Sequence, residues 1–336
     1  MSVLVSINCI TYNHEKYIAD ALESFLNQRT DFEYEIIIGE DCSTDNTREI
    51  IKEFMKKYPG KIILITSEKN VGMMENERRI YEASHGKYIA ECEGDDFWID
   101  PYKLQKQINY MEKNQDCTLC FHNAHEVNAN RNIIGNMIPK CIENKSYDCG
   151  EIATLGFIPT ASRVYLKETM ENLPGWYKTA VVGDLPSQLI ITSKGYAYYM
   201  KDIMCAYRVG VENSATFTLF DRSNNEKKII KNQENLISIL DNFNIYSQFK
   251  YSEKIEERRK LYEYQLYFIK GDINKLKELR YKEFYKNVGI KAKVGMYVKS
   301  YSPKIYRKLD KVYRPMKDKV KQIQYEINHL LIGRKI

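Results

Sequence analysis

The hydrophobic positions in the first third of the chain alternate between short continuous runs and stripes of helical spacing. Continuous runs, which are typical of strands buried on both faces, cover residues 3–10, 35–39, 61–66 and 87–92. The stripes that follow them predict helices over residues 18–26, 47–58, 73–84 and 101–111. Two of these helices start with capping residues, because Asp45-Asn46-Thr47 precedes the second and Asp100-Pro101 caps the fourth, with proline at its first position.

Strands and helices that alternate at this spacing predict right-handed βαβ units, and therefore an α/β fold around a mostly parallel central sheet. In such a sheet, ligands bind beyond the carboxyl ends of the strands. Acidic and amide side chains are concentrated in the loops that follow the strands. We expect these loops to lie along one edge of the sheet: residues 11–14, 40–45, 70–72 and 93–98.

The pattern changes twice further along the chain. Residues 117–207 combine shorter strand signals with glycine and proline, and after residue 215 the strand signals fade into stretches rich in Lys, Glu and Tyr. Apolar stripes at 236–243 and 261–268 predict helices in this last part. We therefore expect an α/β domain over residues 1–215 and a helical C-terminal region over residues 216–336.

Charge is distributed unevenly along the chain. Residues 290–336 hold thirteen Lys and Arg against three acidic residues, a net charge of +10, which leaves −4 for the rest of a chain whose total is +6. A mildly acidic body with a basic tail does not favour a nucleic-acid enzyme. Despite Gly295 and Pro303, apolar positions form a stripe between the lysines of the tail: Val294, Tyr297, Val298, Tyr301, Ile305, Leu309 and Val312. Such a stripe is typical of a helix at an anionic membrane surface, or of an ordinary appendage packed on the core.

Three features bear on the compartment. No run of eighteen or more apolar residues occurs, so we expect no membrane-spanning helix. The first six residues have neither a basic region nor a small-residue cleavage site, and we expect a cytosolic protein, peripheral at the membrane if the tail binds there. Cys117 and Cys120 form a CxxC pair in an apolar run typical of a buried strand, which favours structural thiols over zinc or redox chemistry.

The run Glu93-Gly94-Asp95-Asp96 directly follows an apolar strand. Three carboxylates within four residues repel one another unless they are solvated or neutralised by a cation. At the carboxyl end of a sheet they would offer oxygen ligands to Mg²⁺ or Mn²⁺, which usually bind one or two carboxylates together with phosphate oxygens. The alternative is a solvated acidic turn, although Asp100 already caps the following helix.

A second acidic loop, at residues 39–45, also joins a strand to a helix. A carboxylate of Glu40 or Asp41 can accept hydrogen bonds from a base edge or a ribose hydroxyl. The alternative is helix capping by Ser43, Thr44 or Asp45, which requires neither Glu40 nor Asp41.

The order of these loops carries a resemblance. A strand ending in Thr11-Tyr12-Asn13 is followed by Glu40-Asp41-x-Ser43-x-Asp45, by Asn70-Val71-Gly72 and by Glu93-Gly94-Asp95-Asp96. This order resembles the family 2 glycosyltransferases, whose usual motifs are "TYN", "DDxSxD", "NxG" before a helix with basic residues, and "DxDD". The resemblance covers residues 1–125 well and residues 150–215 more loosely. It implies a GT-A fold, a nucleoside diphosphate sugar donor, Mn²⁺ or Mg²⁺ as cofactor, and a glycan or lipid-linked acceptor in bacterial surface polysaccharide synthesis.

The resemblance also implies roles for the matching residues. The first two loops correspond to nucleotide contacts, with Thr11 and Asp41 at the base and ribose, joined by Tyr12, Asn13 and Glu40. Asn70 and Arg78 or Arg79 correspond to the segment beside the base and the phosphates. Glu93 and Asp95 correspond to positions near the ribose or the metal. Asp96 corresponds to the direct metal ligand, with Asp95 beside it.

Downstream, Asp184 stands just before an expected helix. In similar family members an acid at this place is the catalytic base, which takes the proton of an acceptor hydroxyl as it attacks the anomeric carbon in a single inverting displacement. The alternative for Asp184 is a helix N-cap. Residues 157–162 resemble the floor of the donor or acceptor pocket. Nearby, His122 is favoured as a core histidine, and Trp98 either stacks on a sugar face or packs at the surface.

Two positions depart from the family pattern. Glu93 stands at the first acidic position, and its longer side chain still provides oxygens. Tyr207-Arg208-Val209-Gly210 resembles a "YRxH" element with glycine in place of histidine, so a metal contact is absent or comes from elsewhere, with His14 and His125 as weak substitutes. Arg208 would help to hold the leaving diphosphate. A non-catalytic relative that binds nucleotide or glycan therefore stays open, whereas a dinucleotide dehydrogenase is disfavoured because residues 11–14 are not GxGxxG.

Overall fold

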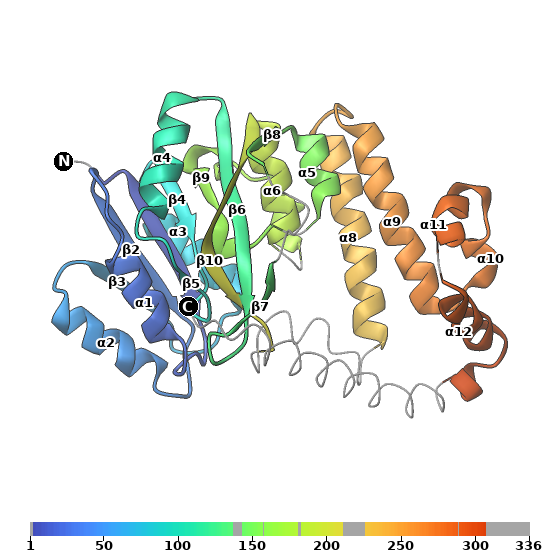
Figure 1. The fold of residues 1–336 in the computed structure, drawn as a ribbon, viewed down its shortest axis with the longest axis horizontal. Coiled ribbons are helices and arrows are strands. Elements are labelled where there is room, and N and C mark those ends of the chain that lie inside the picture. Colours follow the sequence, from blue (N-terminus) through green and yellow to red (C-terminus); the bar gives the residue numbers. More distant parts are fainter. Residues whose placement is uncertain are drawn as a thin grey trace. The chain divides into compact units, whose positions relative to one another are not determined.

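The computed structural model describes residues 3–136, 143–156, 158–180, 183–210, 226–287 and 289–306. The chain divides into two compact units, the first ending at Ser214 and the second beginning at Ala215. The first unit is a sheet covered by helices on both faces, and the described part of the second unit consists of helices (Figure 1).

Among the described residues, six strands of the first unit run parallel: β1 (Val5–Thr11), β2 (Tyr34–Glu40), β3 (Ile62–Thr66), β4 (Tyr88–Glu91), β6 (Cys117–Val127) and β10 (Tyr196–Arg208). The strand order is β3-β2-β1-β4-β9-β6-β10-β5. The short strand β9 (Val164–Leu166) lies antiparallel between β4 and β6. The other antiparallel strands are β5 (Phe97–Trp98), β7 (Ile133–Asn136) and β8 (Lys145–Tyr147). The mostly parallel sheet is confirmed, and the antiparallel strand at its centre is an addition that the sequence pattern did not predict.

Helices cover both faces of this sheet with their apolar stripes. One face packs against α1 (Ile18–Leu26), α2 (Thr47–Lys57) and α4 (Lys103–Lys113), and the other against α3 (Met73–Ala83), α5 (Cys149–Leu155) and α6 (Asp184–Ser193). Short 3₁₀ helices are η1 (Thr160–Ser162), η2 (Lys167–Met170) and η3 (Tyr177–Thr179). The fourth helix begins at Lys103 and not at Pro101, because residues 100–103 form a turn in which the Asp100 side chain accepts a hydrogen bond from the Tyr102 amide at 2.8 Å.

The direction of the strands positions the site. Because the six parallel strands run the same way, their carboxyl ends meet at one edge of the sheet. The residues that end these strands are Thr11, Glu40, Thr66, Glu91, Val127 and Arg208. The loops expected to bind a ligand start at this edge.

The second unit contains α8 (Glu226–Tyr246), α9 (Ser252–Lys270), α10 (Ile273–Leu276), η4 (Leu279–Tyr281), α11 (Lys282–Asn287) and α12 (Ile290–Tyr301). The expected stripe on α8 is buried at Ile239, Leu240 and Phe243. Helix α12 ends just before Pro303, which disfavours helical backbone at the residue preceding it. Leu309 and Val312 of the expected tail stripe lie outside the described residues. No helix in the described part of the chain is long and apolar enough to cross a bilayer.

Candidate active site

The loops after β1 and β2 are tied together by short polar contacts. The Asn13 side chain, on a residue with a left-handed φ of 56°, accepts a hydrogen bond from the Thr44 amide at 2.8 Å. Thr11 is buried, and its hydroxyl lies 3.2 Å from Nδ1 of His14. Tyr12 is exposed, with 36% of the residue's surface accessible. The first loop therefore places Thr11, Tyr12 and Asn13 at the edge expected for the nucleotide.

Asp41 connects the second loop to the third. One carboxylate oxygen accepts hydrogen bonds from the Val71 amide at 2.7 Å and the Ser67 hydroxyl at 3.2 Å, and the other accepts from the Gly72 amide at 2.9 Å. The Asn70 side chain accepts from the same Gly72 amide at 3.1 Å. Asp41 thus fixes the turn at Asn70, and whether it also meets the ribose stays a prediction.

Glu40 supports the loop from inside. It is fully buried, forms an ion pair with Arg48, and accepts a hydrogen bond from the Ser43 amide at 2.5 Å. Both of its oxygens are therefore engaged within the protein. Glu40 therefore shapes the loop in this structure, and whether it also meets a nucleotide stays a prediction.

The acidic loop after β4 is buried, which excludes the solvated turn. Asp95 and Asp96 are 8% and 1% exposed. A side chain at Gly94 would lie 2.5 Å from the Thr11 hydroxyl, so only glycine allows this loop to approach the first one. Burial raises the pKa of Asp96 well above its usual range, and the charge of Asp95 adds to this effect. Burial, followed by the charges of Asp95 and Asp96, likewise raises the pKa of Glu93.

Arg208 braces this loop from the end of β10. Its backbone amide donates to Oδ1 of Asp96 at 2.8 Å, and its guanidinium donates to the Asp95 carbonyl at 2.5 Å and pairs with Asp20. The guanidinium also lies against the rings of Tyr17 and Phe97. Arg208 is only 3% exposed. Its observed contacts are thus internal, and a contact with a diphosphate remains an expectation.

One buried carboxylate oxygen in the acidic loop has no hydrogen-bond partner among the described residues. This atom is Oδ2 of Asp96, while Oδ1 of the same carboxylate is held by Arg208. An unpaired buried carboxylate oxygen is costly unless a cation binds it. Within the described residues no group of three or more His, Cys, Asp or Glu is arranged to hold an ion by itself. The donor set therefore fits a divalent cation that takes one or two carboxylates here and its remaining ligands from a phosphate-bearing substrate.

Of the two histidines considered as substitutes for the missing one, His14 is at the site. Its Nε2 lies 4.0 Å from Oδ2 of Asp95. The ring of His125 instead lies on β6, with Nδ1 2.7 Å from the side chain of Asn136. Gly210 has a left-handed φ of 76°, a conformation that glycine adopts without strain.

Asp184 is the first residue of α6 and does not cap that helix, because the N-cap position is Gly183 and has no side-chain bond. Its Oδ1 lies 3.2 Å from Nη2 of Arg163 and accepts a hydrogen bond from Thr160 at 3.4 Å. The negative charge of Asp184 is among those that raise the pKa of Glu93, so the two carboxylates lie within electrostatic reach. Asp184 therefore belongs to the same acidic neighbourhood as the β4 loop.

Glu77 of α3 joins this neighbourhood without any signal in the sequence motifs. Burial raises its pKa to about 8, together with the charges of Glu91 and Asp184. Because the folded chain then keeps a proton that the unfolded chain releases, stability falls as pH rises from about 4.3 to about 8. We expect Glu77→Gln to be more stable than the wild type at pH 8.5 by about 1–2 kcal/mol, measured by urea unfolding.

The control for Glu77→Gln is Glu75→Gln on the same helix. Glu75 is an exposed partner of Arg78, whose hydrogen bond lowers the pKa of Glu75, so its removal should bring no gain at high pH. If Glu77→Gln and the wild type lost the same stability between pH 5 and pH 8.5, Glu77 would not carry the extra proton.

The two expected basic contacts on α3 differ in where their side chains lie. Arg78 lies on the exposed side of α3, paired with Glu75 and Glu82. The Arg79 side chain donates to the Thr66 carbonyl at the end of β3. Arg78 therefore serves the helix surface in this structure, and of the two only Arg79 reaches a strand end.

Several neighbouring side chains belong to the core. Trp98 is 4% exposed and donates from Nε1 to the Ala161 carbonyl at 2.8 Å, so neither sugar stacking nor a surface role applies. His122 is fully buried with Nδ1 2.8 Å from the Asn123 carbonyl, as expected for a core histidine. Cys117 and Cys120 are buried free thiols, and burial raises the pKa of both.

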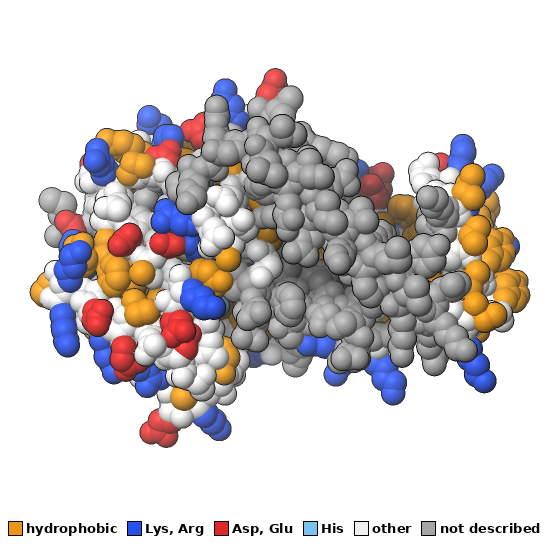
Figure 2. Space-filling model, turned by 60° about the horizontal axis from the view of Figure 1, so that its bottom comes forward, with side chains coloured by type: hydrophobic (Ala, Val, Ile, Leu, Met, Phe, Trp, Pro, Cys, Tyr) orange, Lys and Arg blue, Asp and Glu red, His pale blue; other side chains and the backbone are white. Residues whose placement is uncertain are grey.

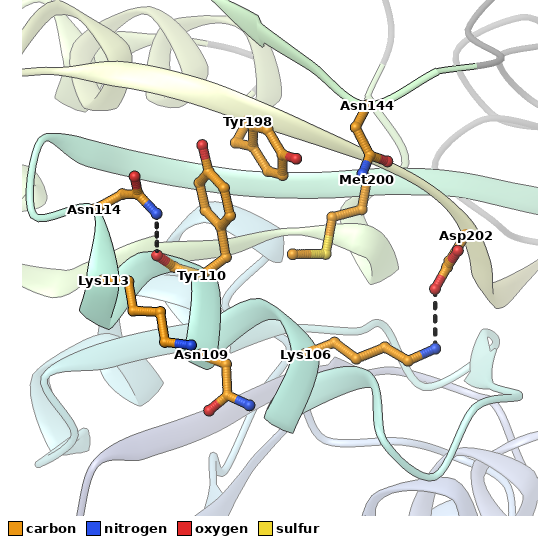
Figure 3. Close-up of a pocket in the computed structure, with 9 residues that line it drawn as sticks. All are labelled: Lys106, Asn109, Tyr110, Lys113, Asn114, Asn144, Tyr198, Met200 and Asp202. Carbon is orange, nitrogen blue, oxygen red and sulfur yellow. Dashed lines mark hydrogen bonds and ion pairs between the residues drawn. The ribbon is translucent and has the colours of Figure 1, made fainter.

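A cavity of about 410 Å³ lies apart from these residues, between α4 and β10 (Figure 3). The rings of Tyr110 and Tyr198 stack in it at 3.6 Å, and Lys106 pairs with Asp202 at its rim. None of the residues expected to bind the donor lines it. The cavity therefore does not define the candidate active site.

The chain matches one family model and several curated proteins. Residues 6–169 match the model of Glycosyl transferase family 2. An uncharacterized protein of Mycobacterium tuberculosis is 35% identical over 191 residues, 54% of this chain and 55% of that protein. An uncharacterized glycosyltransferase of Methanocaldococcus jannaschii is 29% identical over 250 residues, 73% of this chain and 77% of its own. The UDP-Glc:alpha-D-GlcNAc-diphosphoundecaprenol beta-1,3-glucosyltransferase WfgD of Escherichia coli is 33% identical over 135 residues, 40% of this chain and 51% of its own. The chain thus spans about half the length of the mycobacterial relative.

Solved structures share the fold at low sequence identity. TarS of S. aureus in complex with UDP-GlcNAc has a TM-score of 0.58 at 14% identity, covering 89% of this chain and 79% of that one. The mannosyltransferase PcManGT from Pyrobaculum calidifontis in complex with GDP-Man and Mn²⁺ has a TM-score of 0.54 at 13% identity, covering 92% and 83%. These likenesses show that the chain has the GT-A fold. Residues 6–169 of the chain belong to glycosyltransferase family 2.

Proposed function

We propose that this chain is an inverting, metal-dependent glycosyltransferase that moves a sugar from a nucleoside diphosphate sugar to a hydroxyl of a glycan or lipid-linked acceptor in surface polysaccharide synthesis. The observation that carries the proposal is the unpartnered Oδ2 of Asp96 at the strand edge, in the same acidic neighbourhood as Asp184. The first would hold the donor's cation, and the second would take the proton of the acceptor.

The cation has a defined task in this proposal. Mn²⁺ or Mg²⁺ held by Asp96, with Asp95 beside it, would offset the negative charge that gathers on the leaving diphosphate. The chain's own residues position the carboxylate that would hold the cation. Arg208 holds one oxygen of Asp96, and Gly94 keeps the loop against Thr11.

The donor and acceptor classes rest on relatives. The structures with the same fold hold UDP-GlcNAc and GDP-Man with Mn²⁺, and the name of the Escherichia coli relative gives a diphosphoundecaprenol acceptor. We therefore propose a nucleoside diphosphate sugar as donor, with UDP-GlcNAc and GDP-mannose as the first candidates, and a lipid-linked glycan as the first acceptor to try.

A thermal-shift screen tests the proposal directly. UDP, GDP and their sugars are added with Mn²⁺, with Mg²⁺ and with a chelator, and a ligand at a hundred times its Kd should stabilise the protein by about 2.7 kcal/mol. Stabilisation by one nucleotide only when metal is present supports the proposal. No shift with any nucleotide and metal would contradict it.

The alternative is a non-catalytic relative that binds nucleotide or glycan, and Gly210 in place of histidine favours it. Binding alone does not separate the two. Transfer or hydrolysis of the bound sugar does, because only the enzyme releases the nucleoside diphosphate. A chain that binds a nucleotide sugar with metal but never turns it over would be the non-catalytic relative.

We further propose that α12 meets an anionic membrane surface on the cytoplasmic side. Its exposed apolar side chains, which follow one another at helical spacing, are Ile290, Val294, Tyr297, Tyr301 and, just beyond its end, Ile305. Figure 2 shows hydrophobic side chains gathered at the right-hand end of the view, where α10, α11 and α12 lie. Lys293 and Lys304 lie between the apolar positions, a pattern typical of interfacial helices.

Flotation with liposomes containing anionic lipid tests the membrane contact. The triple change Ile290→Ser, Val294→Ser and Tyr301→Ser should lower the floating fraction at least about threefold, because it removes the apolar part of the contact. The control is Ile245→Ser, which removes a 65% exposed apolar side chain of α8. Equal flotation of the triple variant and the wild type would refute a role for this helix face.

A further inference from the structure

A buried guanidinium connects the candidate base to the sheet. Arg163, which directly precedes β9, is 2% exposed. Its Nη2 lies 2.7 Å from Oε2 of Glu91 and 3.2 Å from Oδ1 of Asp184. One nitrogen of a single side chain therefore reaches the last residue of β4 and the first residue of α6 at once.

The backbone of Arg163 is fixed on both sides. Its carbonyl accepts a hydrogen bond from the Glu91 amide at 3.3 Å, and its amide donates to the Thr160 carbonyl at 3.1 Å. A buried arginine must keep its charge, and here two carboxylates neutralise it. The guanidinium thus holds the Asp184 side chain through Nη2, which also pairs with Glu91.

The attachment uses only one oxygen of Asp184. Both Arg163 and Thr160 reach Oδ1, whereas Oδ2 has no hydrogen bond to the described residues. The Asp184 side chain is 46% exposed, although its partner Arg163 is buried. A general base needs this arrangement, with one oxygen held and the other open to the hydroxyl whose proton it takes.

We infer that Arg163 is a positioning residue that holds Oδ1 of Asp184 and so aims Oδ2 at the acceptor hydroxyl. This inference rests on the proposed function. In the step concerned, Oδ2 of Asp184 accepts the proton of the acceptor hydroxyl, while the oxygen of that hydroxyl bonds to the anomeric carbon. The bond from that carbon to the diphosphate breaks, and its electron pair leaves with the nucleoside diphosphate.

Glu91 is the residue that fixes the guanidinium in this arrangement. It lies inside the apolar run of β4 and is 8% exposed. The charge of Arg163 opposes the effect of burial, which raises the pKa of Glu91. Glu91 and Asp184 therefore share the same guanidinium nitrogen of Arg163.

The competing interpretation gives Arg163 a purely structural task, the pairing of β4 with β9 through Glu91. The two interpretations differ in whether the effect of an Arg163 substitution on turnover requires an intact Asp184. A positioning residue loses its effect on turnover once the base is gone, whereas a structural residue keeps it, because effects that act through one another are not additive.

The experiment is a cycle of Arg163→Lys, Asp184→Asn and their combination, assayed with a donor sugar and Mn²⁺. Lysine keeps the charge beside Glu91, so the fold is retained, but it lacks the fork that reaches two carboxylates. We expect Arg163→Lys to lower kcat at least about tenfold with the donor KM within about twofold, and to cost nothing further when Asp184 is already Asn.

A second variant guards against a folding defect. The pair Arg163→Met with Glu91→Gln removes both buried charges together and avoids an uncompensated one. It should bind nucleotide with Mn²⁺ normally and lose at least about tenfold in kcat. A normal kcat in both Arg163 variants beside an inactive Asp184→Asn would overturn the inference and leave the base in place. An equal loss from Arg163→Lys in the two backgrounds would make Arg163 structural. Full activity of Asp184→Asn would instead remove the base assignment itself.

Discussion

Asp184→Asn is expected to lower the kcat of sugar transfer by at least about a hundredfold, since a positioned acid or base commonly contributes that much. The acceptor hydroxyl has a pKa far above neutral and must lose its proton as it attacks. Asparagine keeps an oxygen that accepts from Arg163 but has no basic site. The loss should therefore appear in kcat, while the KM for the donor and the nucleotide-dependent thermal shift stay close to those of the wild type.

The matched control for this variant is Asp202→Asn. The Asp202 side chain is 46% exposed, as is that of Asp184, and it also has a cationic partner, Lys106. It lies at the cavity beside α4 and not at the acidic edge. Near-normal transfer by Asp184→Asn would remove it as the base. A comparable loss in Asp202→Asn would show that the effect is not specific to the site.

The arrangement of the loops was accessible from the sequence because it follows from strand direction. Parallel strands bring their carboxyl ends to one edge, whatever their order in the sheet. The contacts of Asn13 with Thr44, of Asp41 with Val71, and of Gly94 with Thr11 confirm that the four loops meet. Buried-strand runs and helical stripes located these loops within a few residues.

The contact between Glu91 and Arg163, which supports the loops, could not be predicted from the sequence in the same way. Glu91 and Arg163 are far apart in the sequence, and they meet because β9 inserts antiparallel beside β4, a pairing that periodicity does not reveal. The available signal was a charged residue within or beside an apolar strand run, as in Ile89-Ala90-Glu91-Cys92. Such a charge is costly unless it is paired.

Exposure also separates residues that the sequence motifs treat alike. Glu40 and Arg78 match their motifs equally well as residue types, yet one is fully buried and the other is on a helix surface. Trp98 follows the acidic loop, but its ring packs against Phe25 at 4.9 Å inside the core. A motif therefore locates a segment, and the packing of each side chain decides whether it can reach a ligand.

Asp96→Asn is the second change with a large expected effect. It should lower activity strongly without lowering the stability of the metal-free protein. Without the carboxylate the cation loses its ligand, and we expect kcat with Mn²⁺ to fall at least about a hundredfold. Burial raises the pKa of Asp96. In the metal-free protein, ionising this carboxyl group therefore costs folding stability once the pH rises above the ordinary aspartate pKa of about 3.9. Asparagine keeps the bond from the Arg208 amide and removes that cost. The metal-free variant should thus be at least as stable as the wild type at pH 8.

The measurement pairs an activity assay with thermal unfolding at pH 6 and pH 8, each with and without Mn²⁺ and nucleotide. The wild type should lose activity to a chelator, regain it with Mn²⁺ or Mg²⁺, and gain stability from metal and nucleotide together. Its metal affinity should rise with pH, because the cation competes with the proton for Asp96. Asp96→Asn should show none of these responses while unfolding at an equal or higher temperature without metal. If the variant were less stable without metal, Asp96 would be part of the fold's own support, and if it still bound nucleotide with Mn²⁺ normally, the cation would lie elsewhere.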